Sequence, residues 1–209
     1  MCTTIETAIR HFREGGMLIL VDDEGRENEG DLSIGAEHAS AESVNFMITH
    51  GRGLVCAPIS EDRARQLELA PICPEETALD ATCFTISVDA ASGIGSGISA
   101  HDRAKTILRI ADAATPEELS RPGHIFPLIA REGGVLARPG HTEAAVDLAR
   151  LAGLRPAAVL CEILNQDGTM ARLPQLRELA ERHDLPIVHI ADLIDYRRRT
   201  EEPAPPTNS

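Results

Sequence analysis

Six carboxylates and one arginine lie within the eleven residues from Asp22 to Leu32, directly after the apolar run Met17 to Val21. Carboxylates gathered at the end of a buried strand repel one another unless a cation lies among them. The segment is therefore typical of a metal site built from oxygen ligands. A solvated loop face is the alternative, because most acidic runs simply face water.

A second set of reactive residue types precedes the helical run 144–151, in the segment Arg138-Pro139-Gly140-His141-Thr142-Glu143. A helix start offers free backbone N–H groups and the positive end of the helix dipole, which together bind anions. Gly140 would let a ligand approach the backbone, while Arg138 and Thr142 supply a guanidinium and a hydroxyl. These residues predict a phosphate cradle, and an ordinary helix with Thr142 as its N-cap is the alternative.

Three further side chains suggest metal or acid–base chemistry. His141 would complement a carboxylate such as Glu27 in a metal site, although one histidine with one glutamate is a weak pattern by itself. His124 is a lone histidine, a type that is commonly structural. Glu162 lies within the apolar run 159–164, where a carboxylate costs several kcal/mol unless it is paired or protonated. Glu162 is therefore the sharper anomaly and suits a group that exchanges protons.

The elements that must position these residues alternate between short strands and short helices. The predicted strands span 17–21, 54–58, 82–88, 124–130, 157–164 and 187–190. Several of them are apolar on both faces, as a covered sheet requires. Helices are predicted over 40–51, after the capping boxes at Ser99 and Thr115, after Thr142 and Leu173, and in a closing helix that ends near Tyr196.

We therefore predict an α+β fold, an α/β sandwich in which helices cover a mixed β-sheet. A single domain would span residues 1–199, and the polar, proline-rich residues 200–209 would form a disordered tail. The glycine-rich segment 93–97 matches neither the dinucleotide-binding nor the P-loop pattern, so we predict a flexible turn there. Five cysteines without a C-x-x-C pair argue against a disulfide framework and a zinc ribbon. Cys56 and Cys161 lie in apolar runs and are expected to be buried thiols, with Cys56 also a candidate for lining a pocket.

Composition argues against two classes of function. The 209 residues carry a formal net charge of -13, with no Trp, one Tyr and four Phe, so phosphate backbones are repelled and bases find little to stack on. We expect no nucleic-acid partner. No apolar stretch approaches the roughly 20 residues that span a bilayer, and the N-terminus lacks signal-peptide features. We expect no membrane association and a cytoplasmic protein.

Four runs taken together, DDEGRENEGDL, RPGHIFPL, GGVLARPGHTEAAVDLARLAG and CEILNQDGTMAR, resemble the 3,4-dihydroxy-2-butanone 4-phosphate synthase family of riboflavin biosynthesis. The resemblance covers the chain from Ile5 to Arg198. It implies a lyase that converts D-ribulose 5-phosphate to L-3,4-dihydroxy-2-butanone 4-phosphate and formate. It also implies two Mg²⁺ ions per active site, with Mn²⁺ as a substitute, and a homodimer whose active sites lie at the subunit interface. Because the chain ends in a polar tail after Arg199, we expect the monofunctional form, without the cyclohydrolase often fused to this family.

The resemblance also assigns roles to individual residues. Glu27 and His141 would be the metal ligands. Catalysis would rest on His124, Glu162 and Asp22, with Asp22 and Glu29 shaping or charging the site. Arg138, Gly140 and Thr142 would hold the substrate phosphate. The full set in contact with substrate would be Arg26, Glu27, Asp31, Arg138, Pro139, Gly140, His141, Thr142 and Glu162.

One segment departs from the family pattern. Residues 74–82, PEETALDAT, stand where members more often carry an Asn-Thr pair and a glycine-containing or aromatic stretch. The loop is a candidate for lying near the substrate, so the departure reflects either a related sugar-phosphate substrate or a difference of lineage. Two rival functions are a magnesium-dependent isomerase or aldolase, which would release no formate, and a non-catalytic metal-binding regulatory module. The module predicts the loss of some of the proposed ligands and catalytic residues, yet Glu27, His124, His141 and Glu162 are all present.

Overall fold

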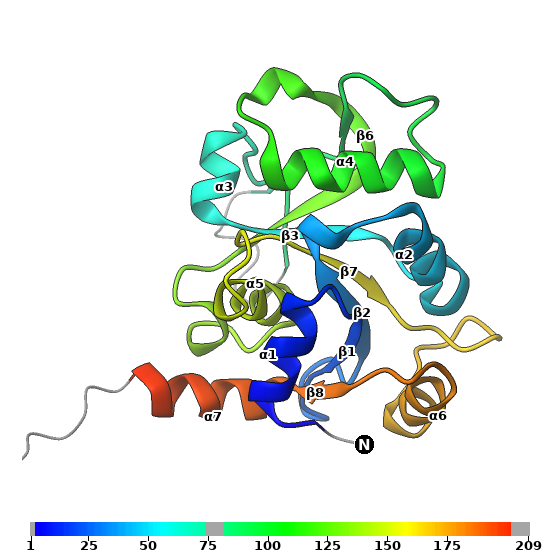
Figure 1. Cartoon of the computed structure of the whole chain (residues 1–209), viewed down its shortest axis with the longest axis vertical. Helices are drawn as coiled ribbons and strands as arrows, with labels where there is room; N and C mark the ends of the chain where they lie inside the picture. Colours follow the sequence, from blue (N-terminus) through cyan, green and yellow to red (C-terminus); the bar gives the residue numbers. More distant parts are fainter. Residues whose placement is uncertain (1–2, 74–81, 202–209) are drawn as a thin grey trace, which may run out of the picture.

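The computed structural model describes residues 3–73 and 82–201, which form one mixed β-sheet with helices on both faces (Figure 1). Within these residues the strand order is β4-β6-β3-β7-β2-β1-β8, and β5 pairs with β6. Neighbours β1 and β8, and β3 and β6, run parallel, while the other pairs are antiparallel. The strands are β1 Leu18–Val21, β2 Gly30–Gly35, β3 Cys56–Ser60, β4 Cys83–Phe84, β5 Val88–Ala90, β6 Leu119–Ala130, β7 Ala158–Glu162 and β8 Ile187–His189.

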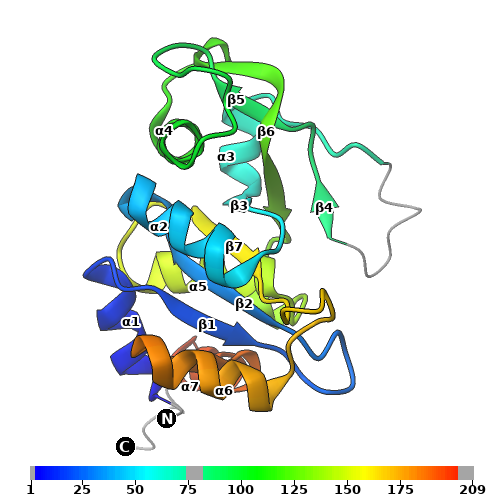
Figure 2. The ribbon, with the colours of Figure 1, turned by 90° about the vertical axis from the view of Figure 1, so that its right-hand side faces the viewer.

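Alternate residues of the central strands enter two different hydrophobic cores. In β1, Leu18 and Leu20 pack into one core while Ile19 and Val21 pack into the other, so all four are buried. One core is closed by α1 (Ile5–Arg13), α5 (His141–Leu151) and α7 (Ile190–Glu201). The opposite core is closed by α2 (Ala41–Phe46), α3 (Glu61–Gln66), α4 (Ala100–Asp112) and α6 (Leu173–His183), and Figure 2 shows this arrangement from the side. The predicted α+β fold with a covered mixed sheet is confirmed.

Most predicted elements are present, with shifted ends. The expected strand 82–88 is divided into β4 and β5, and the helix expected after Ser40 consists of α2 and a π-helical turn at Met47–Gly51. The prediction of an α-helix after Thr115 is wrong. Only a 3₁₀ turn forms, at Pro116–Glu118, and β6 begins directly at Leu119. The sequence Arg121-Pro122-Gly123 explains this, because the residue before a proline disfavours helical backbone and proline lacks an N–H donor.

Three elements of the structure were not predicted from the sequence: β2, α1 and α3. Strand β2 includes Gly30, Asp31 and Leu32, which were read as part of an acidic loop; its hydrogen bonds to β1 and β7 impose the extended conformation despite poor strand propensity. Helices α1 and α3 were also missed. Helix α7 extends to Glu201, so residues 200–201 are helical rather than part of the predicted tail, and residues 202–209 lie outside the described residues. In the described residues, the helices are too short or too polar to cross a bilayer.

Candidate active site

The two segments singled out by sequence meet in a pocket of about 160 Å³ at one end of the central strands. The acidic loop between β1 and β2, the start of β2, the end of β7, the start of β3 and the start of α5 all line it. Eight of the residues that the resemblance assigns to the site line this pocket: Arg26, Glu27, Glu29, Asp31, Arg138, His141, Thr142 and Glu162. Residues that are more than a hundred positions apart in sequence are therefore brought into one site.

Asp22 organises the backbone of the acidic loop. Its buried carboxylate accepts hydrogen bonds from the Glu27 N–H at 2.9 Å and the Glu29 N–H at 2.8 Å, and from Arg26 Nη1 at 3.0 Å. Both oxygens are occupied, and the side chain does not line the pocket. These contacts support the shaping role expected for Asp22. Asp23 and Glu24, by contrast, are exposed on the loop.

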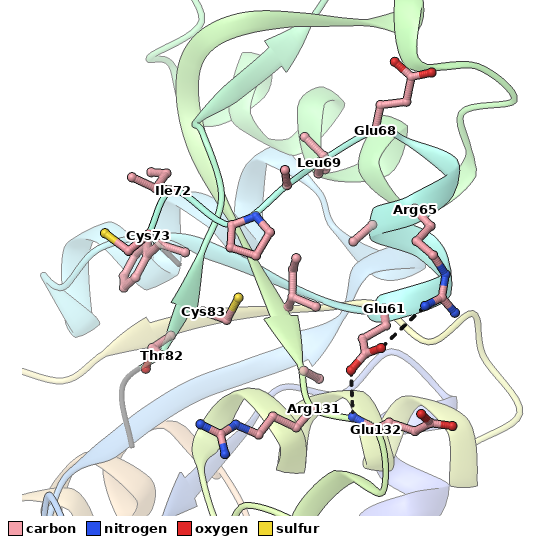
Figure 3. A pocket seen from close by; sticks show the side chains of 16 residues that line it. Glu61, Arg65, Glu68, Leu69, Ile72, Cys73, Thr82, Cys83, Arg131 and Glu132 are labelled. Atoms are coloured by element: carbon pink, nitrogen blue, oxygen red, sulfur yellow. Dashed lines mark hydrogen bonds and ion pairs between the residues drawn. The ribbon is translucent and has the colours of Figure 1, made fainter. Parts of the chain in front are cut away.

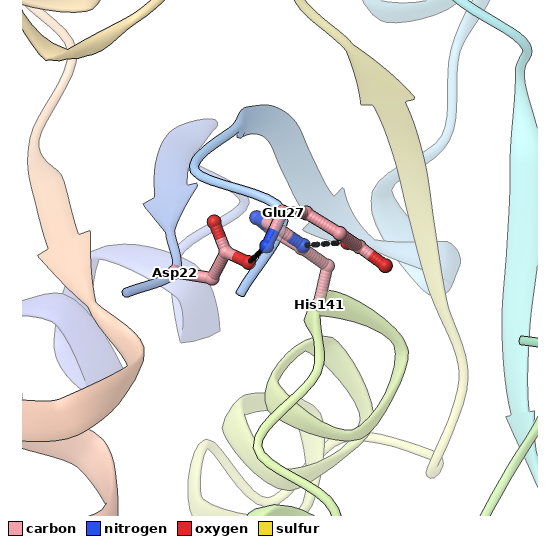
Figure 4. A group of neighbouring side chains, drawn as sticks. All are labelled: Asp22, Glu27 and His141. Carbon is pink, nitrogen blue, oxygen red and sulfur yellow. Dashed lines mark hydrogen bonds and ion pairs between the residues drawn. The ribbon is translucent and has the colours of Figure 1, made fainter. Parts of the chain in front are cut away.

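The side chains of Glu27 and His141 point toward each other (Figure 4). Glu27 Oε2 lies 3.5 Å from His141 Nδ1 and 2.8 Å from Arg26 Nη1. Ligand atoms of Asp22, Glu27 and His141 lie within 4.8 Å of one another, but the Asp22 oxygens already accept three hydrogen bonds. Among the described residues, the buried Nε2 of His141 has no hydrogen-bond partner, which is costly unless a bound group satisfies it. One imidazole among several carboxylates suits a hard divalent cation that keeps some of its water, so these residues fit Mg²⁺.

The charges of this pair depend on each other. The hydrogen bond from His141, aided by the Arg26 guanidinium, lowers the pKa of Glu27 to about 2. Burial by itself would lower the pKa of His141, but the carboxylates of Asp31, Glu27 and Asp22 outweigh it and raise that pKa to about 9. In the metal-free protein a carboxylate therefore faces an imidazolium. A cation held by Glu27 and His141 would replace the imidazolium's charge, because a histidine ligand must be neutral.

Asp31 and Glu162 lie directly opposite each other in the β2–β7 register. Asp31 is 6% exposed, and burial raises the pKa of its carboxyl to about 7. Glu162 lies in the predicted strand, but the full burial expected there is wrong. It is the last residue of β7 and is half-buried, and its Oε2 accepts a hydrogen bond of 2.7 Å from the Leu54 N–H. The strand end lets the carboxylate reach the pocket without full desolvation.

The segment expected to hold phosphate has a different local structure from that predicted. Gly140, not Thr142, is the N-cap of α5, so Thr142 lies in the first helical turn, where it is buried and lines the pocket. The buried Arg138 donates to Glu143 Oε2 at 2.7 Å and to Thr82 Oγ1 at 3.3 Å.

This ion pair also explains why residue 140 is a glycine. A Cβ there would lie 2.2 Å from Arg138 Nη1 and 2.8 Å from Glu143 Oε2. The absent side chain thus makes room for the ion pair. Pro139 is exposed, and neither it nor Gly140 lines the pocket.

His124 is not brought to the pocket of its own chain. It lies on β6, its side chain is 41% exposed, and its Nδ1 lies 2.7 Å from Asp89 Oδ2. The glycine-rich turn nearby is held in place, because the N–H groups of Gly95 and Gly97 each donate to Asp102 Oδ2 at 3.2 Å. This turn contributes no residue to the pocket lining.

Leu54, Cys56, Thr82 and Phe84 also line the pocket, and of these only Leu54 and Phe84 were not predicted from the sequence to lie near a site. Thr82 ends the divergent segment noted above, and residues 74–81 of that segment lie outside the described residues. Leu54 and Phe84 line the pocket and leave 42% and 37% of their surface exposed. Cys56 lines it as a buried thiol whose pKa is raised by burial and by the charge of Glu162. Cys161 is buried as expected, and burial raises its pKa to about 12.

A larger cavity of about 1100 Å³ lies between α3, the segment after it and the strands β4 and β6 (Figure 3). Its charged side chains interact with each other and with backbone: Glu61 lies 3.6 Å from Arg65 and accepts a hydrogen bond from the Glu132 N–H. Of the residues in the predicted site, none lines this cavity. The residues with suitable chemistry are in the smaller pocket.

Comparison with known proteins shows the family of the chain. Residues 6–196 match the family model described as 3,4-dihydroxy-2-butanone 4-phosphate synthase. The chain belongs to this family. The riboflavin biosynthesis protein RibBA of Parabacteroides distasonis is 60% identical over 200 residues, which cover 95% of this chain and 49% of the relative. The chain thus spans about half the length of the curated relatives it matches.

Solved structures of the synthase family share the fold. RibBX, a two-domain 3,4-dihydroxy-2-butanone 4-phosphate synthase from A. baumannii, is 52% identical with a TM-score of 0.91, over 96% of this chain and 59% of that one. A synthase in complex with two magnesium ions is 40% identical with a TM-score of 0.90, over 95% and 98% of the two chains.

Proposed function

We propose that this chain converts D-ribulose 5-phosphate to L-3,4-dihydroxy-2-butanone 4-phosphate and formate in riboflavin biosynthesis, and that the reaction depends on Mg²⁺. The observation that carries the proposal is the convergence of Glu27, His141, Asp31 and Glu162 with the start of α5 in one pocket. Membership of the synthase family supports the same reaction.

Glu27 and His141 are the proposed metal ligands, with two Mg²⁺ ions in each site and Mn²⁺ able to replace them. When bound, the cations act as Lewis acids that stabilise oxyanions on the sugar. The related structure that contains two magnesium ions supports this assignment. Asp22 fixes the loop so that Glu27 and Arg26 point into the pocket, since its three hydrogen bonds close the loop on itself.

The substrate phosphate is proposed to bind at the start of α5. The first turn of a helix presents N–H groups without intrahelical acceptors, and its dipole favours an anion. Thr142 adds a hydroxyl at this turn, and Arg138 adds a positive charge from the pocket wall. Because Arg138 already pairs with Glu143, its guanidinium is held in place before substrate arrives.

Asp31 and Glu162 are proposed to handle protons. The reaction removes a proton from C3 to give an enediol and then loses water from C1; after a skeletal rearrangement, C4 leaves as formate. A carboxyl group with a pKa of about 7, as in Asp31, can both accept and donate protons near neutral pH. Glu162 is held through Oε2 by the Leu54 N–H, which orients its other oxygen for the substrate.

We propose further that the cytoplasmic protein is a homodimer in which His124 of the partner subunit completes the pocket. The catalytic role that the resemblance assigns to His124 requires this, because His124 does not line the pocket of its own chain. Leu54 and Phe84 are large apolar side chains exposed at the pocket, where a second subunit would cover them.

Product analysis tests the reaction. Purified protein incubated with ribulose 5-phosphate and Mg²⁺ is expected to release one formate for each pentose phosphate consumed, together with a four-carbon ketone phosphate. Chelation of the metal should stop both. Unchanged pentose phosphate would contradict the proposal and indicate an inactive protein. Conversion to another sugar phosphate without formate would also contradict it and would favour an isomerase or aldolase.

A further inference from the structure

The pair formed by Asp89 and His124 lies outside the pocket described above. We propose that Asp89 is a positioning residue that fixes the tautomer and direction of the His124 ring, so that Nε2 is the atom offered to substrate. This inference rests on the catalytic role proposed for His124. The geometry of the pair, however, stands on its own.

Asp89 holds His124 at two points. Its Oδ1 accepts a hydrogen bond of 2.9 Å from the backbone N–H of His124, and its Oδ2 lies 2.7 Å from the ring Nδ1. The carboxylate side chain is only 9% exposed, whereas the imidazole is 41% exposed. A buried carboxylate that hydrogen-bonds to both the backbone N–H and the ring of one residue fixes the orientation of that ring.

The hydrogen bond between Asp89 and His124 also determines which ring nitrogen carries the proton. A carboxylate only accepts hydrogen bonds, so the neutral ring must hold its proton on Nδ1 and present the lone pair of Nε2 outward. When Nε2 takes a proton from the substrate, the positive charge on the ring lies 2.7 Å from the Asp89 carboxylate. An imidazole arranged in this way is suited to accept a proton and return it.

The fold is adapted locally to this pair. The β5–β6 register shifts between Val88 and Asp89, and such bulges re-aim a side chain. Gly97 packs against the pair with a φ of +92°, a conformation that favours glycine, and a Cβ there would lie 2.2 Å from Asp89 Oδ2 and 2.6 Å from His124 Nδ1. The Gly97 N–H is in turn held by Asp102. The bulge and the glycine turn therefore both accommodate the carboxylate–imidazole contact.

The variant Asp89→Asn tests the inference, because the amide keeps the size of the carboxylate but can donate to Nδ1. The kcat is expected to fall on the order of 10²-fold, with KM for ribulose 5-phosphate within about twofold of wild type. The matched control is Asp112→Asn, an exposed aspartate on α4 near Arg109, which should leave both constants unchanged. An unchanged kcat in Asp89→Asn would overturn the positioning role.

A double-mutant cycle separates positioning from a general structural effect. In a His124→Gln background, adding Asp89→Asn should cost no more than about twofold in activity, since the ring it positions is gone. A further loss as large as in the wild-type background would overturn the inference.

Nitrogen NMR of the imidazole gives a readout that does not depend on activity. At a pH where the ring is neutral, the wild-type protein should show His124 protonated at Nδ1, and Asp89→Asn should shift the proton to Nε2. An Nε2-protonated ring in the wild type would overturn the inference, even if the variant fails to fold. If the wild type shows the Nδ1 tautomer but no formate release, the pair stands and the proposed function fails.

Discussion

At the scale of single residues, the six carboxylates of the acidic run are not equivalent. Asp22 is buried and folds the loop through three hydrogen bonds, Glu27 faces His141, and Asp31 is buried in β2, while Asp23 and Glu24 are exposed. The sequence indicates that a cation would neutralise some of these charges. It cannot say which ones, because the division depends on how the loop backbone folds around Asp22.

At the scale of elements, the site depends on loops held by rigid neighbours. The acidic loop closes at the Val21–Gly30 pair of the β1–β2 hairpin. Arg172, the N-cap of α6, donates to the carbonyls of both Glu27 and Asn28. Asn28 has a φ of +56°, a left-handed conformation that asparagine adopts more readily than most other non-glycine residues. Arg172 therefore holds the loop in the form that presents Glu27.

Removing the Arg172 side chain should weaken metal binding. Arg172→Ala is expected to lower Mg²⁺ affinity about tenfold, a loss of the size seen when a residue supporting a metal ligand is removed, and to reduce the free energy of unfolding by about 1–3 kcal/mol. Arg177→Ala, at an exposed position on the same helix, is the control and should change neither quantity. Calorimetric titration and denaturant unfolding measure the two effects. Wild-type Mg²⁺ affinity in Arg172→Ala would show that the loop holds its form unaided.

The sequence predicts the covered sheet because strands such as β1 are apolar on both faces. It also brings Glu27 and His141 together through family motifs, and the structure places these residues face to face. It could not locate Asp89 beside His124 or the Leu54 N–H beside Glu162, since these partners are 35 and 108 positions apart. Such contacts follow from strand register, and register here includes a bulge and a strand, β2, that lacks a strong strand pattern.

At the scale of the whole molecule, two cores support one sheet, and the pocket lies at the ends of strands from its centre. The pocket holds the proposed metal ligands, while His124 lies on β6 outside it. A symmetric dimer would bring His124 of each subunit to the pocket of the other, because a two-fold axis repeats the same contact in both sites.

Mixing two inactive variants tests this arrangement. His124→Gln and Glu162→Gln should each lose most of their turnover as homodimers, while a mixed dimer contains one site with both native residues. Equal mixing should restore about a quarter of wild-type activity, since about half of the dimers are mixed and each has one intact site. Differently tagged chains that co-purify confirm that subunits have exchanged. Mixed dimers without activity, or elution of the wild type at monomer size, would contradict the shared site.

The acidic loop and the start of α5 are proposed to form one site that binds divalent metal, and titration calorimetry with Mg²⁺ measures this binding. Glu27→Gln removes a ligand charge and is expected to weaken Mg²⁺ binding by about tenfold or more. Glu24→Gln, an exposed carboxylate of the same loop, removes the same charge and should bind Mg²⁺ as the wild type does. Equal weakening in both variants would indicate a diffuse acidic surface, and wild-type affinity in Glu27→Gln would place the metal elsewhere.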